Sequence, residues 1–295
     1  MRVAILNRDR AWWPGGDLVE IDNRIAALAK LGVECVYEPL DLTGVDVVHV
    51  FHSNFDWSLA NMERAWAYNI PYVVTPIFYA GYRGTPGHGS AARITEDLRE
   101  AAAVMPFSRW EAEEIAKELG ALLVREVDII PNGTSPDFHA EDGFNRSGVC
   151  TVVARTPDVI KNSGLIKDAC ALAGLPYEQI CGIAPAEMPA AYQRFKVFVS
   201  ASKGERMSLV VGEALCSGCR VLSTTENRGN EWYPGLQTIS PAMTPKALSA
   251  IISVAYKRDD WDWRPNKAAR ALTWDRCAAA TLKVYERGIK CHASQ

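Results

Sequence analysis

The chain of 295 residues is long enough for one large or two medium domains, each with its own core. Its 48% hydrophobic and 23% charged content is that of an ordinary globular protein, and a net charge of −3 excludes a strong overall attraction to nucleic acid or anionic membranes. Charge is divided unevenly, because residues 1–138 hold 12 Lys/Arg against 20 Asp/Glu and the remainder holds 20 against 15. The second half is therefore the better candidate for an anionic ligand.

Short β-rich runs alternate with helical patterns along the first half, which is typical of a parallel sheet. The expected strands are 3–6, 34–37, 45–51, 72–75 and 104–107, and the expected helices are 18–31, 59–68, 91–102 and 110–120. A Gly-rich loop covers residues 80–90. This half is predicted to form one doubly wound α/β domain.

The second half repeats the alternation. The expected strands are 150–154, 179–183, 197–201 and 220–223, and the expected helices are 164–173, 189–195 and several within 245–290, the last from 275 to about 288. Gly, Pro, Asn, Asp and Ser concentrate at 133–148, so the linker is expected there. The chain is predicted to be an α/β protein of two Rossmann-like domains facing a cleft, with ligands beyond the carboxyl ends of the strands.

Targeting and redox signals are weak. The first six residues form a short strand pattern rather than a signal peptide, and no apolar run approaches the roughly 20 residues that span a bilayer. The eight cysteines favour reduced thiols in a cytoplasmic protein. Cys216 and Cys219 have the spacing of a metal pair, but no second pair follows, and Gly218 is typical of a helix C-cap. We therefore expect no metal site.

Two glutamates follow the expected strand 197–201. Glu205 lies in the turn after it, and Glu213 lies about one and a half turns into the next helix. The amides between them crown a helix N-terminus, where a phosphate binds well. Carboxylates can accept hydrogen bonds from hydroxyl groups, and the neighbouring amides can bind phosphate. Together they suit a sugar nucleotide. This spacing of glutamates is common by chance, and the strand–turn–helix context gives it meaning.

Five stretches, in this order, resemble the donor-binding domain of GT-B glycosyltransferases, especially retaining glycosyltransferase family 4 (glycosyl transferases group 1). They are 128–133, Val153 to Arg155 followed by Lys161, 198–213, 214–223, and 272–275 with 284–285. The resemblance implies a GT-B fold whose C-terminal helix packs back on the first domain. It places an acceptor-side domain at 1–134 with helix 276–295 and a donor domain at 135–275.

The resemblance also implies roles for the donor site. Arg155 and Lys161 would stabilise the leaving diphosphate, because a planar fork and a point charge are complementary phosphate ligands. Glu205 would hold hydroxyls of the transferred sugar near the reacting carbon, and Glu213 would accept hydrogen bonds from the ribose. The amides of Ser208 and Leu209 and the loop of Gly15 and Gly16 would approach the donor phosphates.

The implied reaction moves a hexosyl group from a UDP-sugar to an acceptor hydroxyl with retention, by front-face attack without a protein nucleophile or a metal. The family often has a His after a first-domain strand, but the corresponding run, 73–79, has none. His49, His52 and His88 are nearby in the sequence pattern. Of these, His88 in the Gly-rich loop is the expected acceptor contact. Arg206 and Met207 are bulkier than the family's residues after the first Glu, so an unusual donor is expected.

The acceptor is expected to meet first-domain loops through Trp13, Arg83 and His88. A glycan, a lipid-linked sugar, a small molecule or a hydroxymethylated DNA base stays open, as does contact with a membrane surface. Residues 64–95 contain no Asp or Glu, so this region is locally positive and would favour contact with DNA. The overall acidity of the domain, however, argues against tight DNA binding. The alternatives are a catalytically weakened sugar-nucleotide-binding protein and a GT-B epimerase or phosphorylase.

Overall fold

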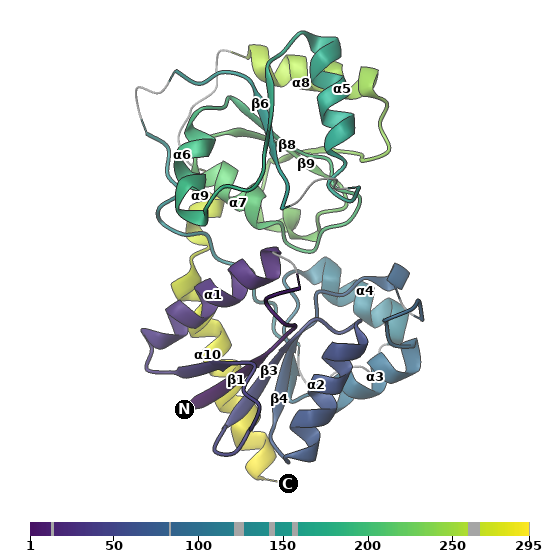
Figure 1. The fold of residues 1–295 in the computed structure, drawn as a ribbon, viewed down its shortest axis with the longest axis vertical. Coiled ribbons are helices and arrows are strands. Elements are labelled where there is room, and N and C mark those ends of the chain that lie inside the picture. The colour runs from purple at the N-terminus through teal and green to yellow at the C-terminus, as the bar shows by residue number, and fades with distance from the viewer. Residues whose placement is uncertain are drawn as a thin grey trace. The chain divides into compact units, whose positions relative to one another are not determined.

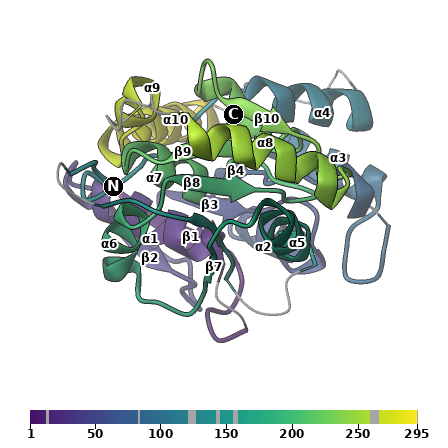
Figure 2. The same cartoon turned by 90° about the horizontal axis from the view of Figure 1, so that it is seen from above.

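The computed structural model describes residues 1–12, 15–82, 84–120, 127–141, 145–154, 159–258 and 266–294. The chain forms two compact units, Met1–Asn132 with Trp274–Gln295 and Gly133–Thr273, called units 1 and 2 below. Over the described residues, each unit is built on a five-stranded sheet whose strand pairs are all parallel, with helices packed on it (Figure 1, Figure 2). Parallel strands need crossover connections, which these helices supply.

The sheet of unit 1 has the strand order β2-β1-β3-β4-β5. Its strands are β1 (Arg2–Leu6), β2 (Glu34–Tyr37), β3 (Val47–Phe51), β4 (Tyr72–Thr75) and β5 (Ala103–Val104). The two strands β3 and β4 are buried along their whole length. They are runs rich in β-branched residues, as expected for central strands covered on both faces.

Five helices are described in unit 1, and two of them begin at a serine cap. They are α1 (Gly16–Ala29), α2 (Asp56–Ala67), α3 (Ala91–Glu100), α4 (Arg109–Leu119) and α10 (Trp274–Ala293), with a short 3₁₀ turn η1 (Ala80–Tyr82). Ser90 Oγ accepts a hydrogen bond from the Arg93 amide at the start of α3. Ser108 Oγ accepts one from the Glu111 amide at the start of α4. Each cap satisfies a backbone donor that the helix itself leaves unpaired.

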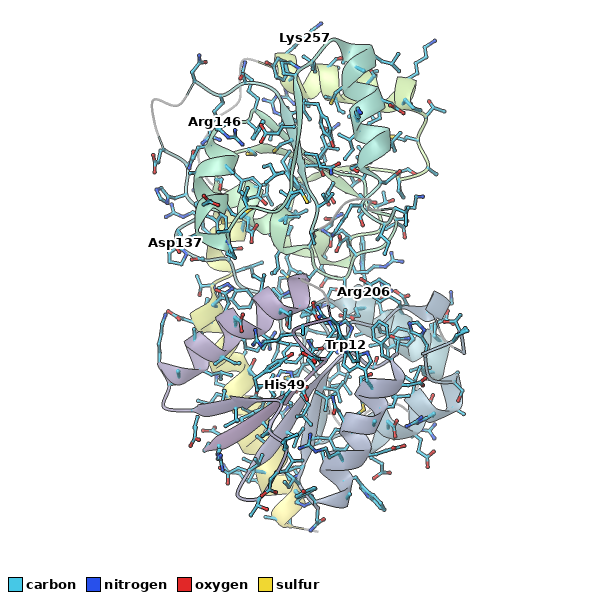
Figure 3. All side chains as sticks on the ribbon, in the orientation of Figure 1. Trp12, His49, Asp137, Arg146, Arg206 and Lys257 are labelled. Atoms are coloured by element: carbon cyan, nitrogen blue, oxygen red, sulfur yellow. The ribbon has the colours of Figure 1, made fainter. Side chains whose placement is uncertain are left out.

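The C-terminal helix α10 belongs to unit 1 and packs along α1 (Figure 1). His49 on β3 is labelled in Figure 3. The Tyr285 hydroxyl of α10 lies 2.7 Å from its Nδ1, and its Nε2 lies 2.8 Å from Thr75 Oγ1. Burial lowers the pKa of His49 well below its usual range. His49 is therefore a neutral core residue. The packing of α10 in unit 1 confirms the prediction that the C-terminal helix packs back on the first domain.

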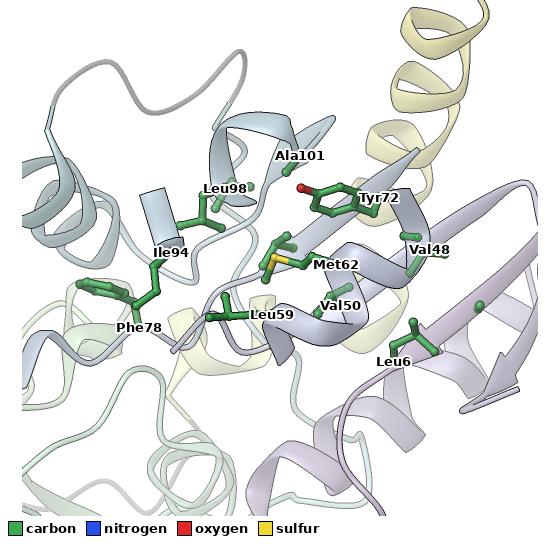
Figure 4. Packing of buried hydrophobic residues seen from close by; sticks show 14 of the residues in the cluster. Leu6, Val48, Val50, Leu59, Met62, Tyr72, Phe78, Ile94, Leu98 and Ala101 are labelled. Atoms are coloured by element: carbon green, nitrogen blue, oxygen red, sulfur yellow. The ribbon is translucent and has the colours of Figure 1, made fainter. Parts of the chain in front are cut away.

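The core of unit 1 fills the space between the sheet and helices α2 and α3 (Figure 4). Val50 and Tyr72 from the strands meet Leu59, Met62 and Ile94 from the helices, and all five are almost fully buried. Burying such a side chain contributes about 1.5–3 kcal/mol. This packing holds the carboxyl ends of β3 and β4 in place.

The sheet of unit 2 has the strand order β10-β9-β8-β6-β7. The strands are β6 (Val149–Val152), β7 (Tyr177–Ile180), β8 (Val197–Ser200), β9 (Arg220–Thr224) and β10 (Gln237–Ile239). The helices are α5 (Ser163–Ala173), α6 (Met188–Gln193), α7 (Leu209–Cys216), α8 (Pro245–Lys257) and α9 (Lys267–Ala271), with 3₁₀ turns η2 (Pro185–Glu187) and η3 (Arg228–Trp232). Helices α5 and α8 lie side by side and pack on each other (Figure 2). The central strand β8 leads directly into the turn that carries Glu205.

Several details differ from the sequence prediction. The strand expected at 104–107 ends at Val104, since Pro106 has no N–H to donate to a ladder. Strand β10 has no counterpart in the prediction, because two of its three residues are exposed and no apolar run marks it. Gly218 follows the end of α7 at φ 80°, which confirms it as a helix terminator. Among the described residues, no helix has both the length and the apolar character needed to cross a membrane.

Candidate functional site

The turn between β8 and α7 carries the predicted donor residues. It lies at the carboxyl end of the central strand of unit 2, the edge at which parallel α/β sheets bind ligands. The turn is tied to the segment after β9: the Glu205 amide donates to Glu226 O at 3.2 Å, and the Arg228 amide donates to Glu205 O at 3.3 Å. The backbone that carries the Glu205 side chain is thereby fixed on both sides.

Lys161 and Glu205 form an ion pair between Nζ and Oε1. Their side chains are 27% and 12% exposed, so this attraction is less screened than that of a surface pair. The segment before α5 is held there because Ile160 O accepts from the Lys203 amide at 2.8 Å and from Ser202 Oγ at 3.3 Å. The structure therefore brings together two residues that the sequence prediction assigned to separate parts of a donor.

The N-terminus of α7 is capped in an unusual way. Ser208 occupies the cap position but its side chain makes no capping hydrogen bond. Ser208 is only 4% exposed, and its Oγ has no hydrogen-bond partner among the residues that the structure describes. The Ser208 amide, predicted to bind phosphate, instead donates to Asn227 Oδ1 at 3.3 Å. Leu209 is the first helical residue, and first-turn amides lack partners within their helix.

This end of α7 therefore offers an unsatisfied hydroxyl beside the positive end of a helix dipole. A buried polar group without a partner costs about 1–3 kcal/mol. An anion that accepts a hydrogen bond from Ser208 Oγ recovers that cost and gains the dipole interaction. These features of the α7 N-terminus favour an anion over a cation.

Glu213 lies on α7, and its carboxyl is oriented by α6. The Tyr192 hydroxyl donates to Glu213 Oε2 at 3.0 Å. Burial raises the pKa of Glu213 to about 7, and the hydrogen bond from Tyr192 acts in the opposite direction. Glu213 as a whole residue is nevertheless partly exposed. A group donating to this carboxylate would be bound most tightly when the proton is absent.

A buried amide network behind the turn escaped the sequence analysis. Asn227 is fully buried, accepts from the amides of Ser208 and Gly229, and donates to Asn230 Oδ1 at 2.9 Å. Asn230 Nδ2 in turn donates to Thr224 O at 2.7 Å. The sequence does contain a signal for it, because two asparagines around a glycine shortly after a strand favour a turn that is held by side-chain hydrogen bonds. This network positions the cap of α7.

Met207 packs against that turn. A Cβ on Gly229 would lie 2.8 Å from Met207 Cγ and 3.0 Å from its Cα, so only glycine allows this approach. Met207 and Arg206 are both buried. Met207, whose bulk led us to expect an unusual donor, thus packs against the backbone of the η3 turn.

The predicted glycine loop of unit 1 lies at the carboxyl end of β1. Gly15 precedes α1 in extended conformation, and a Cβ there would lie 2.8 Å from Arg8 Nη2, whereas a Cβ on Gly16 would meet nothing within 4 Å. Arg8 Nε and Nη2 donate to the Asp17 carboxylate at 3.0 and 2.9 Å, and Asn7 Nδ2 donates at 3.0 Å. Glycine at position 15 therefore makes room for a charged pair directly beneath the loop.

Of the three predicted acceptor residues, His88 lies in the described part of the chain. His88 Nδ1 lies 2.9 Å from Thr85 Oγ1 and 3.1 Å from Pro86 O, and its ring packs on Phe55 at 4.7 Å between centroids. The residue is half-buried and held within its own turn. Trp13, Arg83 and Arg155 lie outside the described residues.

Comparison with known proteins identifies the architecture. No family model matches the chain, and no curated protein does. Among solved structures, it is similar to the sucrose-phosphate synthase from Thermosynechococcus elongatus, with a TM-score of 0.81 and 14% identity over 100% of both chains. The protein has the GT-B fold.

Two further likenesses span nearly whole chains. Anabaena HepE in complex with UDP and glucose has a TM-score of 0.71 and 14% identity, over 97% of this chain and 99% of that one. A glycosyltransferase from Rickettsia africae has a TM-score of 0.66 and 11% identity, over 98% and 99%. The predicted GT-B fold class is thus confirmed, while identities this low establish the fold alone.

Proposed function

We propose that this protein is a glycosyltransferase that moves a hexosyl group from a UDP-sugar to an acceptor hydroxyl. The observation that carries the proposal is the segment from β8 into α7, which carries Glu205 paired with Lys161, an unsatisfied Ser208 hydroxyl at a helix N-terminus, and Glu213, whose pKa burial raises. The fold supports it, since HepE, a structure of the same architecture, was crystallised with UDP and with UDP-glucose.

Each residue of the turn takes one part of the donor in this proposal. Glu213 accepts hydrogen bonds from the ribose hydroxyls. Ser208 Oγ and the Leu209 amide bind a phosphate oxygen. Lys161, with Arg155, stabilises the negative charge that develops on the diphosphate as it leaves. Glu205 holds hydroxyls of the transferred sugar. Its ion pair with Lys161 also keeps the Lys161 side chain in position.

The division of labour follows the predicted domains. We propose that residues 135–275 bind the donor, and that residues 1–134 with 276–295 bind the acceptor through Trp13, Arg83 and His88. The backbone at Gly15 and Gly16 approaches the donor phosphates. The reaction retains the anomeric configuration by front-face attack and uses no metal ion. The acceptor is a glycan, a lipid-linked sugar, a small molecule or a hydroxymethylated DNA base.

The donor assignment is tested by calorimetric titration of the full chain with UDP-glucose. Glu213→Ala removes hydrogen bonds to a charged acceptor, each worth about 1.5–3 kcal/mol, so the affinity falls about 10-fold to 100-fold. Glu178→Ala is the matched control, since Glu178 forms an exposed pair with Arg194 in the same unit. Such surface pairs contribute little. Equal affinities of Glu213→Ala and wild type would reject the site.

Transfer itself is measured by UDP release with glycan, lipid-linked and hydroxymethylated-DNA acceptors. Release that depends on an acceptor supports the transferase, and NMR of the product reports whether the anomeric configuration is retained. Tight UDP-glucose binding without release for any acceptor identifies a sugar-nucleotide-binding protein instead. Turnover of UDP-glucose without any sugar acceptor identifies an epimerase or phosphorylase.

A further inference from the structure

A pocket of about 260 Å³ opens at the amino edge of the sheet in unit 1. It lies where the turn after α2 enters β4, beside the end of α3 and the last turns of α10, which ends at this edge (Figure 1). The Gly15–Gly16 loop and His88, which carry the proposed donor and acceptor contacts of this unit, follow the carboxyl ends of β1 and β4. The pocket is therefore a separate feature of the same unit.

Two local contacts shape this pocket. A Cβ at Gly288 would lie 3.2 Å from Ala102 Cβ, so glycine lets α10 come close to the residue that precedes β5. On the other side, Asn69 has φ 53°, a left-handed conformation that asparagine tolerates, and its carbonyl oxygen accepts from His292 Nε2 at 3.0 Å. The end of α10 is thus held against both neighbouring segments, and the pocket is part of the folded unit.

An exposed indole lines the pocket. Trp66, near the end of α2, is 73% exposed, and Ile70 and Pro71 lie beside it in the lining. A single exposed apolar residue is common on protein surfaces, but this one borders a concave site that also contains polar groups. Its ring offers a flat apolar face together with an N–H donor. A ligand with one apolar face and polar edges fits such a combination.

The polar lining carries both signs of charge. Glu100, at the end of α3, is exposed, and an ionised carboxylate only accepts hydrogen bonds. Arg287 on α10 only donates, and its side chain stays 35% exposed although it forms an ion pair with Asp128. The Asn69 amide can do both. An ionic ligand would meet a like charge in this pocket, whereas hydroxyl groups, which donate and accept, match the whole lining.

The volume limits the ligand to one ring, because sites that enclose drug-sized molecules measure about 300–1,000 Å³. A hexopyranose has a C–H face that stacks on an indole, and hydroxyls around its edge. We propose that this pocket binds one neutral hexose ring of a glycan, with the ring on Trp66 and its hydroxyls hydrogen-bonded to Glu100, Arg287 and Asn69. The site binds sugar without reaction, so it does not depend on the proposed transfer.

The test follows the indole N–H signal of Trp66 in ¹H–¹⁵N NMR spectra of the full chain, assigned by its loss in Trp66→Phe. The probes are the methyl glycosides of glucose, galactose and mannose. We expect at least one of them to shift this signal in a saturable way, with a Kd of about 1–10 mM for a ligand of so few atoms. The indole signal of Trp110, exposed at the start of α4, is the internal reference and should not move.

A charge-neutral substitution tests the polar contact. Glu100→Gln keeps the shape of the side chain but removes the charged acceptor, whose hydrogen bonds are about twice as strong as neutral ones, so the Kd should rise about 5-fold or more. Glu96→Gln is the matched control, since Glu96 is exposed on the same helix but does not line the pocket, and it should keep the wild-type Kd. An unchanged Kd in Glu100→Gln would contradict the site as proposed.

Absence of a saturable Trp66 shift with every glycoside would overturn the inference. A shift with tetramethylammonium chloride and none with sugar would assign the pocket to a cation, and a shift on dilution of the protein alone would assign it to a second copy of this chain. Either result rejects the hexose. No UDP-sugar is present in these titrations, so failure to bind UDP-glucose in the calorimetric experiment rejects the proposed function and leaves this site standing.

Discussion

Donor affinity should depend on pH through Glu213. Burial raises the pKa of this carboxyl to about 7, so the free protein is protonated at Glu213 below that pH. Ribose hydroxyls donate to the ionised carboxylate, and binding must therefore remove the proton. The affinity for the donor is therefore highest above pH 7 and decreases as the pH falls below it. An exposed Glu would titrate near pH 4.3 and show no such effect between pH 5.5 and 8.

The magnitude follows from the fraction of ionised carboxyl. With a pKa of about 7, this fraction is about nine-tenths at pH 8 and about one-thirtieth at pH 5.5. The Kd for the donor should thus rise about 30-fold over that interval, equivalent to about 2 kcal/mol at 1.36 kcal/mol per pH unit. Below pH 7 the slope approaches 10-fold per unit.

The assay is calorimetric titration with UDP-glucose at several pH values. UDP itself is unsuitable, because its terminal phosphate has a second ionisation near pH 6, like other phosphomonoesters. Titration in buffers of different ionisation enthalpy should also show about one proton released per ligand at pH 5.5. Glu213→Gln should bind weakly at every pH, with no trend. A flat profile in wild type, or the same pH trend in Glu213→Gln, would refute the reasoning.

Two further predictions concern the residues that support the turn. Tyr192→Phe removes the hydrogen bond to Glu213, so UDP-glucose should bind about 2-fold to 10-fold more weakly and the pH midpoint of affinity should move upward; a midpoint that stays or falls would contradict the hydrogen bond's role. Asn227→Ala removes the acceptor of the buried Ser208 and Gly229 amides, so urea denaturation should show a free energy of unfolding lower by about 1–3 kcal/mol. A loss below about 0.5 kcal/mol, the level of a surface substitution, would contradict the network.

Local structure was largely predictable because its causes are local. The β-branched run of β4 was predicted with the bounds that the structure shows, Tyr72–Thr75. Gly218 was recognised as the end of α7 from its place after an apolar helical stretch, and its φ of 80° confirms this. Where the prediction failed, the signal was weak, as for the exposed residues of β10. Periodicity reports burial, and a short exposed edge strand has none.

Side-chain partners were predictable only where a motif already joined them. The sequence analysis placed Lys161 near a phosphate and Glu205 near a sugar, but it did not pair them, because 44 residues separate them in the chain. The Tyr192–Glu213 hydrogen bond joins two helices and leaves no trace in the spacing of either. Trp66 was not singled out, since the pocket that it lines exists only where α10 packs beside the start of β4 in the folded chain.

The sequence by itself determined the class of the fold, the alternation of strand and helix, and the strand–turn–helix that carries Glu205 and Glu213. These features follow from hydrophobic period, turn residues and helix caps, which act over a few neighbouring positions. The tertiary structure alone decided which charges meet, which polar atoms are left unsatisfied and how far burial moves the pKa of Glu213. Each of these depends on atoms that distant strands bring to one sheet edge, and no local pattern encodes that distance.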